Sequence, residues 1–248
     1  MGGGGMSAAP KAKQIDEPDT HNKSASAFAS SVAATTGSEA VQIATPVYWD
    51  EACKHLMKKD RVMKRIIPQH GGACLETRGD AFVTLARSIV GQQISVKAAQ
   101  SVWERFAALP RRMTPGNVLK LKVDDMRAAG LSARKVEYLV DLALHFDSGA
   151  IRVADWKAMD DEAIIAELVG IRGIGRWTAE MFLIFHLMRP NVLPLDDIGL
   201  LNGISRNYFS GEAVSRSDAR EVAAAWAPFC SVATWYIWRS LDPLPVAY

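Results

Sequence analysis

The sequence predicts an all-α protein. Beyond residue 45, apolar residues recur three or four positions apart, which places them on one face of a helix. Helix-capping residues and prolines divide the chain into helix-length stretches. No sustained alternation of β-branched and polar residues occurs, so no sheet is required. With 248 residues, 49% of them hydrophobic, the chain suffices for one large domain or two small ones.

Short polar side chains mark most of the predicted helix starts, because their oxygen accepts a hydrogen bond from a first-turn N–H. Proline directly after a cap suits the first helical position. Two short helices, 50–59 and 61–67, come first and end at Pro68 and Gly71-Gly72. The later starts are Asp80, Ser95, Thr114-Pro115, Ser132, Asp160, Asp196 or Asp197, and Ser217, and the last helix runs from Phe229 to about Ser240.

Apolar residues at helical spacing follow these caps and predict the buried faces. They are Phe82, Leu85, Ala86, Ile89 and Val90 after Asp80; Val96, Ala99, Val102, Trp103 and Phe106 after Ser95; and Val136, Leu139, Val140, Leu142 and Leu144 after Ser132.

The first 45 residues have a different composition, with a Gly2–Gly5 run, many Ala, Ser and Thr, and one aromatic residue, Phe28. Such a segment buries too little apolar surface to offset its ordering entropy. It contains neither a continuous apolar stretch nor an arginine, which argues against a secretory signal and a transit peptide. We therefore expect a disordered tail over 1–45 and a folded domain over 46–248.

Charge and cysteine content exclude several classes of protein. A net charge of +2 requires that any DNA-binding charge be placed locally. The three cysteines, Cys53, Cys74 and Cys230, are too scattered for a disulfide framework or a zinc site, which suggests a reducing compartment. No apolar run reaches the ~20 residues that span a bilayer, so we expect no membrane contact.

A Gly-x-Gly turn, Gly173-Ile174-Gly175, lies between the apolar helical stretches 163–169 and 177–187. Its glycines permit a positive φ and a close backbone approach. The second helix begins there, so its free N–H groups can hold a phosphate oxygen. This is the physical basis of a helix-hairpin-helix, which grips nucleic-acid backbone without reading bases. By itself, such a turn is most often only structural.

Four segments in order resemble the helix-hairpin-helix (HhH-GPD) DNA glycosylase superfamily, and in particular its AlkA-like 3-methyladenine DNA glycosylases. They cover about 46–242 and are Ser88-Ile-Val-Gly-Gln-Gln-Ile-Ser95, the run 173–179, Leu193-Pro-Leu-Asp-Asp197 and Ala233-Thr-Trp-Tyr-Ile-Trp-Arg239. The resemblance implies one glycosylase domain over 46–248, with two helical lobes and a cleft between them. AlkA also carries an N-terminal α/β domain, which the polar segment 1–45 is too short to encode, so we expect a compact form.

The implied activity is release of alkylated purines, such as 3-methyladenine and 7-methylguanine, from duplex DNA by base flipping and hydrolysis, in base excision repair. The transition state resembles an oxocarbenium ion, which a buried carboxylate stabilises. We expect one of Asp196 and Asp197 to cap the next helix and the other to project into the cleft. AlkA-like spacing assigns catalysis to Asp197 with Asp196 as neighbour, although other branches place a single aspartate nearer Asp196.

Trp177 stands where the bifunctional branch, which resembles endonuclease III, has a Schiff-base lysine. That branch's four-cysteine iron–sulfur loop is also missing from the sequence. The resemblance therefore implies an enzyme without lyase activity.

A flipped alkylated purine is cationic, so aromatic faces would attract it. Trp177 and Trp238 hold family positions in the base pocket, whereas spacing favours a core role for Trp235 and Tyr236. The complete set of pocket candidates is Trp177, Trp238, Met181, Trp235 and Tyr236.

AlkA-like enzymes present a wedge between two helices, which fills the gap left by the flipped base. Here the wedge loop carries Gln92-Gln93-Ile94, and either Gln93 or Ile94 inserts. The expected DNA-contacting residues are Gly173, Ile174, Gly175, Arg176, Thr178, Gln92, Gln93, Ile94 and Ser95.

The resemblance also implies a structural Na⁺ or K⁺ held by the backbone carbonyls of Val169, Ile171 and Ile174, and no other cofactor. The histidines show no metal-ligand spacing. The expected partner is double-stranded DNA with alkylated bases, bound by a monomer in a bacterial cytoplasm at the nucleoid or in a eukaryotic nucleus. The alternatives are a non-catalytic helix-hairpin-helix DNA-binding protein and an unrelated all-α scaffold.

Overall fold

The computed structural model describes residues 45–70, 75 and 79–241. These residues form helices joined by loops, and none of them belongs to a β-strand. The all-α prediction is therefore confirmed. Apart from Thr45, the tail expected over 1–45 lies outside the described residues, as does the Gly71-Gly72 pair.

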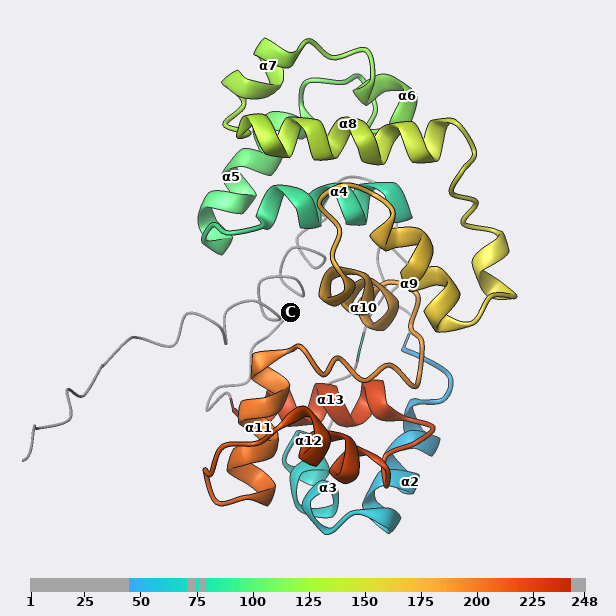
Figure 1. Ribbon diagram of the computed structural model, residues 1–248, viewed down its shortest axis with the longest axis vertical. Helices are drawn as coiled ribbons and strands as arrows, with labels where there is room; N and C mark the ends of the chain where they lie inside the picture. The colour runs from blue at the N-terminus through green and yellow to red at the C-terminus, as the bar shows by residue number, and fades with distance from the viewer. Residues whose placement is uncertain (1–44, 71–74, 76–78, 242–248) are drawn as a thin grey trace, which may run out of the picture.

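The helices form two lobes, one above the other in Figure 1. The upper lobe contains α4 (Ala81–Gly91), α5 (Val96–Ala107), α6 (Pro115–Val118), α7 (Val123–Ala128), α8 (Ala133–Asp147), η2 (Asp155–Lys157), α9 (Asp161–Val169) and α10 (Arg176–Phe185). The lower lobe contains α2 (Trp49–Lys59), α3 (Arg61–Ile66), η1 (Ile67–His70), α11 (Ile198–Tyr208), α12 (Arg216–Ala223) and α13 (Cys230–Arg239).

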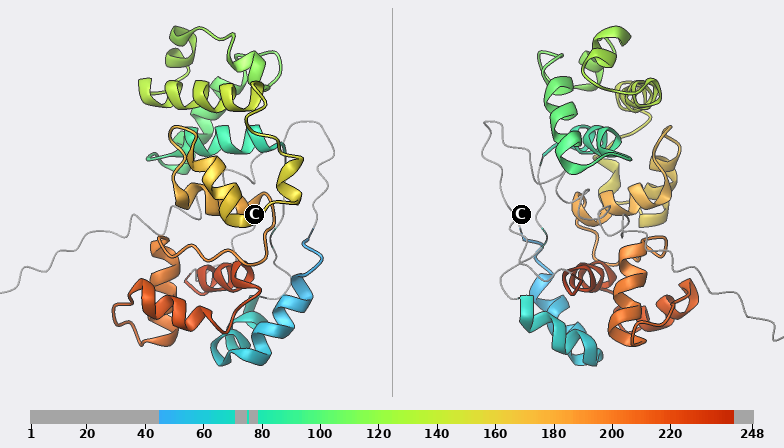
Figure 2. Two further views of the ribbon diagram at one scale, coloured as in Figure 1. Left: turned by 45° about the vertical axis from the view of Figure 1, so that its right-hand side comes forward. Right: turned by 90° about the vertical axis from the view of Figure 1, so that its left-hand side faces the viewer.

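One continuous segment builds the upper lobe, whereas both ends of the described chain build the lower lobe (Figure 2). In the upper lobe, α4 contacts α5, α8 and α10, and α10 contacts α9. In the lower lobe, α13 contacts α2, α3 and α11. The two-lobed prediction is therefore confirmed, and the chain returns from the upper lobe to the lower lobe between α10 and α11.

Most of the predicted caps are confirmed by hydrogen bonds. The side chains of Asp80, Ser95, Ser132 and Asp160 accept from the backbone N–H three residues later, at 3.2, 3.3, 3.2 and 2.8 Å. Thr114 occupies the N-cap of α6 but makes no such bond.

The predicted start at Ser217 is wrong, because Ser215 caps α12. The hydroxyl of Ser215 accepts from the Asp218 N–H at 3.2 Å, and the Asp218 carboxylate accepts from the Ser215 N–H at 2.9 Å. This reciprocal box satisfies two first-turn donors at once. Ser217 therefore lies inside the first turn.

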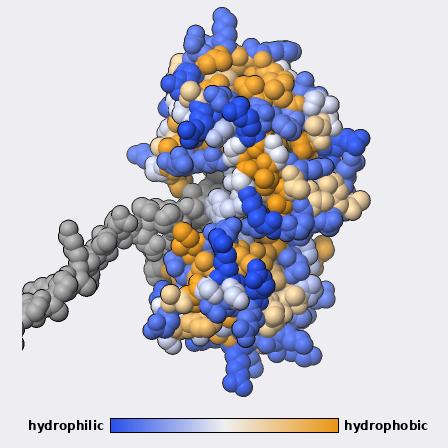
Figure 3. All heavy atoms as spheres, in the orientation of Figure 1, coloured by the Kyte–Doolittle hydropathy of each residue, from blue (hydrophilic) through white to orange (hydrophobic). Residues whose placement is uncertain are grey.

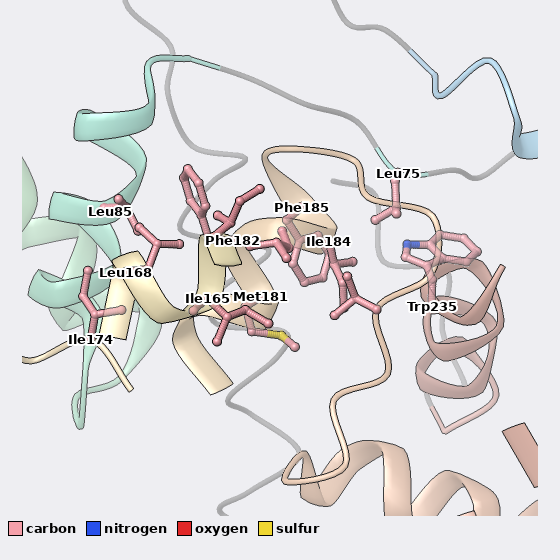
Figure 4. Close-up of a cluster of buried hydrophobic side chains, with 14 of the residues drawn as sticks. Leu75, Leu85, Ile165, Leu168, Ile174, Met181, Phe182, Ile184, Phe185 and Trp235 are labelled. Atoms are coloured by element: carbon pink, nitrogen blue, oxygen red, sulfur yellow. The ribbon is translucent and has the colours of Figure 1, made fainter. Parts of the chain in front are cut away.

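Helix α10 is the central helix of the core. Eight consecutive residues, 178–185, are buried. Figure 4 shows its apolar side chains between Leu85 of α4 and Trp235 of α13. At the far end Phe185 stacks on Trp238, with ring centroids 5.7 Å apart and an interplanar angle of 12°. The hydrophobic core therefore continues from one lobe into the other.

Two glycines on one face of α11 let that helix pack closely against α13. A Cβ on Gly203 would lie 2.3 Å from Cγ2 of Ile237, and a Cβ on Gly199 would lie 3.3 Å from Cδ1 of Trp238. Residues four apart share a helix face, so both glycines are on the α13 side. Their small size brings the start of α11 next to Trp238.

Hydrophobic and hydrophilic residues alternate in patches over both lobes on the face seen in Figure 3. None of the described helices combines the length and apolar character needed to cross a bilayer.

Candidate active site

The turn between α9 and α10 requires a glycine at 173. Gly173 has φ +87°, and a Cβ there would lie 2.2 Å from Cδ2 of Tyr138 in α8. Gly175 has φ −90°, and a Cβ there would meet no atom within 4 Å. The expected positive φ is therefore confined to Gly173. Gly175 instead leaves open space at the N-terminus of α10, where backbone N–H groups have no helical partner.

Arg176 is paired with two carboxylates in this structure. Its Nε donates to Glu180 at 3.0 Å and its Nη1 donates to Glu162 at 2.9 Å, while Nη2 donates to the second oxygen of Glu162. Thr178 and Ile174 are 7% and 4% exposed, so their side chains point into the interior. The side chains of Ile174 and Thr178 are therefore not available to DNA in this structure. The hairpin instead presents its backbone groups and Arg176, whose positive charge is offset by Glu162 and Glu180.

Asp197 is a buried carboxylate, 4% exposed, at the N-cap of α11. Its Oδ1 accepts from the Leu200 N–H at 2.6 Å and from the indole Nε1–H of Trp238 at 2.8 Å. Its Oδ2 accepts from the indole Nε1–H of Trp177 at 2.8 Å. Donors from α10, α11 and α13 thus hold the carboxylate in one orientation.

The expected division of roles between the two aspartates is wrong. Asp197 both caps α11 and reaches the junction of the lobes, because its two oxygens face different donors. Asp196 is exposed, and its carboxylate lies 2.5 Å from Nη2 of Arg216. Geometry therefore favours Asp197 as the reactive group.

An ionised carboxylate can accept about four hydrogen bonds. The described residues supply three to Asp197, two on Oδ1 and one on Oδ2. Oδ2 therefore retains an acceptor position, which can take a proton from water or face a developing positive charge.

Two of the five base-pocket candidates donate hydrogen bonds to Asp197, and the other three are core residues. Trp177 is half-buried and Trp238 is 7% exposed, and both donate to Asp197, a role that the spacing did not predict. Met181 has no exposed surface and cannot contact a base in this conformation, which corrects the prediction.

Trp235 and Tyr236 are core aromatics. They are 4% and 2% exposed and pack edge to face, with ring centroids 4.9 Å apart. Trp235 also packs against Trp49 at 5.3 Å, and the Tyr236 hydroxyl lies 3.3 Å from Sγ of Cys53. Trp235 and Tyr236 are therefore better described as core residues than as residues of the base pocket.

The predicted wedge loop connects α4 and α5. Gln93, Ile94 and Ser95 are exposed, with Ile94 37% accessible. Gln92 is partly buried, and its side-chain amide donates to the carbonyl of Gly173 at 2.9 Å. The structure thus presents Gln93 and Ile94 to solvent and turns Gln92 toward the hairpin.

Sequence reasoning did not single out Glu180, a carboxyl that is 4% exposed and whose Oε2 has no hydrogen-bond partner among the described residues. Burial raises its pKa to about 7, an effect that Arg176 only partly opposes and the nearby charge of Asp196 reinforces. An acidic residue inside the apolar run 179–185 was the available signal.

The cation site implied at Val169, Ile171 and Ile174 stays a prediction. The Ile171 carbonyl accepts the Ile174 N–H at 3.1 Å, and a carbonyl oxygen keeps a second lone pair after one such bond. Carbonyl oxygens are ligands suited to hard cations. The donor set therefore fits the ion. Among the described residues, no cluster of three His, Cys, Asp or Glu could hold a metal.

Comparison with known proteins gives concordant matches. Residues 86–228 match the model of the HhH-GPD superfamily of base excision DNA repair proteins. DNA-3-methyladenine glycosylase 1 of Schizosaccharomyces pombe is 31% identical over 194 residues, which cover 75% of this chain and 85% of the relative.

Two solved structures resemble the fold. The S. pombe 3-methyladenine DNA glycosylase in complex with abasic DNA has a TM-score of 0.65 and 31% identity, and the match covers 77% of this chain and 96% of that one. The DNA-3-methyladenine glycosidase of Bacillus halodurans has a TM-score of 0.74 and 32% identity, with 77% and 89% covered.

The raised pKa of Glu180 predicts a pH-dependent stability. Because the folded-state pKa of about 7 exceeds the ordinary 4.5, the favourable contribution of the protonated form is full below pH 4.5 and is lost as the pH rises through 7. Glu180→Gln cannot ionise. Relative to wild type, it should therefore gain unfolding free energy on the order of 1–3 kcal/mol between pH 4.5 and 8.

Urea unfolding of both proteins at several pH values measures this difference, with Glu221→Gln, at an exposed position of α12, as the control. A difference between Glu180→Gln and wild type that stays constant with pH would contradict the prediction.

Proposed function

This chain belongs to the HhH-GPD superfamily of base excision DNA repair proteins, and we propose that it is a monofunctional DNA glycosylase that releases alkylated purines from duplex DNA. The names of its relatives specify 3-methyladenine, and we propose that purines of the 7-methylguanine type, which are also cationic, are released as well. The observation that carries the proposal is the buried Asp197 carboxylate, fixed by two indole N–H groups and a helix N-terminus beside the hairpin.

In the proposed reaction, the C1′–N bond breaks and its electron pair leaves with the base. Methylation gives the base a positive charge, so it departs as a neutral molecule and needs no general acid. The sugar becomes oxocarbenium-like, and the Asp197 carboxylate stabilises that charge. Water adds to C1′ while its proton passes to Oδ2, the oxygen with the open acceptor position. The products are the free base and an abasic site.

Trp177 and Trp238 orient this carboxylate, and Trp177 also offers a half-buried ring near it. A cationic base over such a ring gains about 0.5–2 kcal/mol. One face of Trp238 is already stacked on Phe185. The indole of Trp177 cannot form a Schiff base, so the strand should stay intact after base release.

The hairpin supplies the grip on the DNA backbone. Gly175 leaves open space in front of the N-terminus of α10, where a phosphate oxygen can meet free N–H groups. A Na⁺ or K⁺ on the carbonyls of Val169, Ile171 and Ile174 would add positive charge at the same turn. We further propose a monomer that acts where genomic DNA lies, in a bacterial cytoplasm or a eukaryotic nucleus.

The proposed function predicts base release without strand cleavage. Methylated duplex incubated with the protein should yield free alkylated purine, and nicks should appear only after alkali. Borohydride should trap no covalent protein–DNA adduct, because no lysine stands at 177. DNA binding without base release would support the non-catalytic alternative, and a stoichiometric adduct would contradict monofunctionality.

Asp197→Asn should abolish base release while damaged DNA still binds. Asparagine has one acceptor oxygen and no negative charge, so it cannot satisfy all three donors or stabilise the sugar cation. We expect single-turnover rates to fall at least ~10²-fold.

Asp196→Asn is the matched control, because it removes an exposed ion pair with Arg216 and should change rates less than about fivefold. An inactive Asp196→Asn beside an active Asp197→Asn would reverse the assignment.

Gly175→Ala should weaken binding to methylated and unmodified duplexes equally, by about fivefold, which corresponds to one lost hydrogen bond. Alanine tolerates φ −90° and its Cβ meets no atom, so the fold should remain intact. The salt dependence of binding should become shallower.

Gly173→Ala provides the contrast, because its Cβ would overlap Tyr138 and destabilise the protein. Fluorescence anisotropy at several salt concentrations and thermal unfolding separate the two effects. A Gly175→Ala protein with wild-type affinity and salt slope would show that the hairpin is only a turn.

A further inference from the structure

The loop that connects α4 and α5 is held at both ends, while its tip is exposed. We infer that Gln92 is a positioning residue that holds this wedge loop against the hairpin. The hairpin that binds the DNA backbone and the side chain that replaces the flipped base would then keep a fixed geometry relative to each other. The inference rests on the proposed function, because it assigns Gln92 a part in flipping the damaged nucleotide.

The tie is a direct hydrogen bond between two loops 81 residues apart in sequence. The side-chain Nε2 of Gln92 donates to the carbonyl of Gly173 at 2.9 Å in a partly buried contact. Gly173 is the hairpin residue with positive φ, so its carbonyl direction is set by that conformation. The bond uses one of the two amide N–H donors of Gln92, so it fixes the position of the side chain beside the hairpin and leaves its Oε1 acceptor unused by this bond.

Further bonds fix the rest of the wedge loop. The ammonium of Lys135 in α8 donates to the carbonyl of Val90 at 2.7 Å, just before the loop, and the Ser95 hydroxyl caps α5 just after it. Between these points Gln93 has φ +60°, a conformation that is unfavourable for a residue with a side chain. Such strain persists only where the surroundings over-determine it, and it occurs preferentially at functional sites.

Helix α8 also supports the hairpin. The Arg172 N–H donates to the Asp141 carboxylate at 2.7 Å, and the Tyr138 ring packs where a side chain at 173 would lie. In Figure 1 the hairpin turn crosses in front of α4, below α8. The same helix therefore contacts the end of α4 just before the wedge loop, through Lys135, and the hairpin, through Tyr138 and Asp141.

Flipping a nucleotide costs base-stacking energy, which the inserted side chain partly offsets. The exposed tip offers Gln93 and Ile94 for this purpose. Contacts between the hairpin and phosphate can favour insertion of this side chain into the DNA only if the loop tip keeps its position relative to the hairpin. The Gln92–Gly173 bond supplies that constraint.

The test compares wild type with Gln92→Met, which keeps the length and packing of the side chain but cannot donate. The substrates are duplexes with one 7-methylguanine, placed either opposite cytosine or opposite an abasic-site analogue, where no pairing partner resists flipping. We expect base release from the paired lesion to fall about fivefold to tenfold, the size of one hydrogen bond, and release from the unpaired lesion to change less than about twofold. Fluorescence of 2-aminopurine beside the lesion should show less extrusion in the variant.

Gln92→Ala repeats the measurement with the side chain shortened, and Gln69→Ala, at an exposed position of η1, is the control. Thermal unfolding shows that each variant is folded. An equal loss on both substrates, or none on either, would overturn the inference while wild-type base release leaves the proposed function intact. Failure of wild type to release any base would instead refute the proposed function.

Discussion

A carboxylate removed from water requires hydrogen-bond donors, and the surroundings of Asp197 provide them. Leu200 donates from α11, Trp238 from α13 and Trp177 from α10. Helix α10 belongs to one lobe and α11 and α13 to the other, so this side chain lies where the lobes meet. Loss of one donor would leave the buried charge short of a partner, at a cost of about 1–3 kcal/mol. The same hydrogen bonds thus join the lobes and orient the carboxylate that we propose to be reactive.

A second aspartate shows which feature separates a reactive carboxylate from a structural one. Asp60 caps α3 and accepts four hydrogen bonds, from the Val62 and Met63 N–H groups on Oδ1 and from the Tyr208 hydroxyl and Trp226 indole on Oδ2. Asp197 has the same N-cap position and aromatic donors but accepts three. All positions of Asp60 are filled, so it can only stabilise the lower lobe. The open position of Asp197 is where substrate or water can bind.

The hairpin carries little unpaired positive charge, as expected for a chain whose net charge is only +2. Arg172 and Arg176 both lie at the hairpin, yet each is paired with glutamates. In the proposed function, phosphate recognition there therefore depends on backbone N–H groups in the space left by Gly175. Binding of this kind is independent of base sequence, which suits an enzyme whose target is a damaged base in any sequence context.

Local patterns were enough to predict the all-α class, most helix caps, the hairpin and the aspartate pair, because helical spacing and capping involve residues close in sequence. Sequence alone did not resolve how Asp196 and Asp197 share their roles, it placed the fully buried Met181 in the pocket, and it did not predict the bond from Gln92 to the hairpin. Those outcomes depend on contacts between residues far apart in the chain, such as Asp197 with Trp238 and Gln92 with Gly173. Only the packing of α10, α11 and α13 decided which carboxylate was buried, because burial and donor supply are set by whole helices meeting in space.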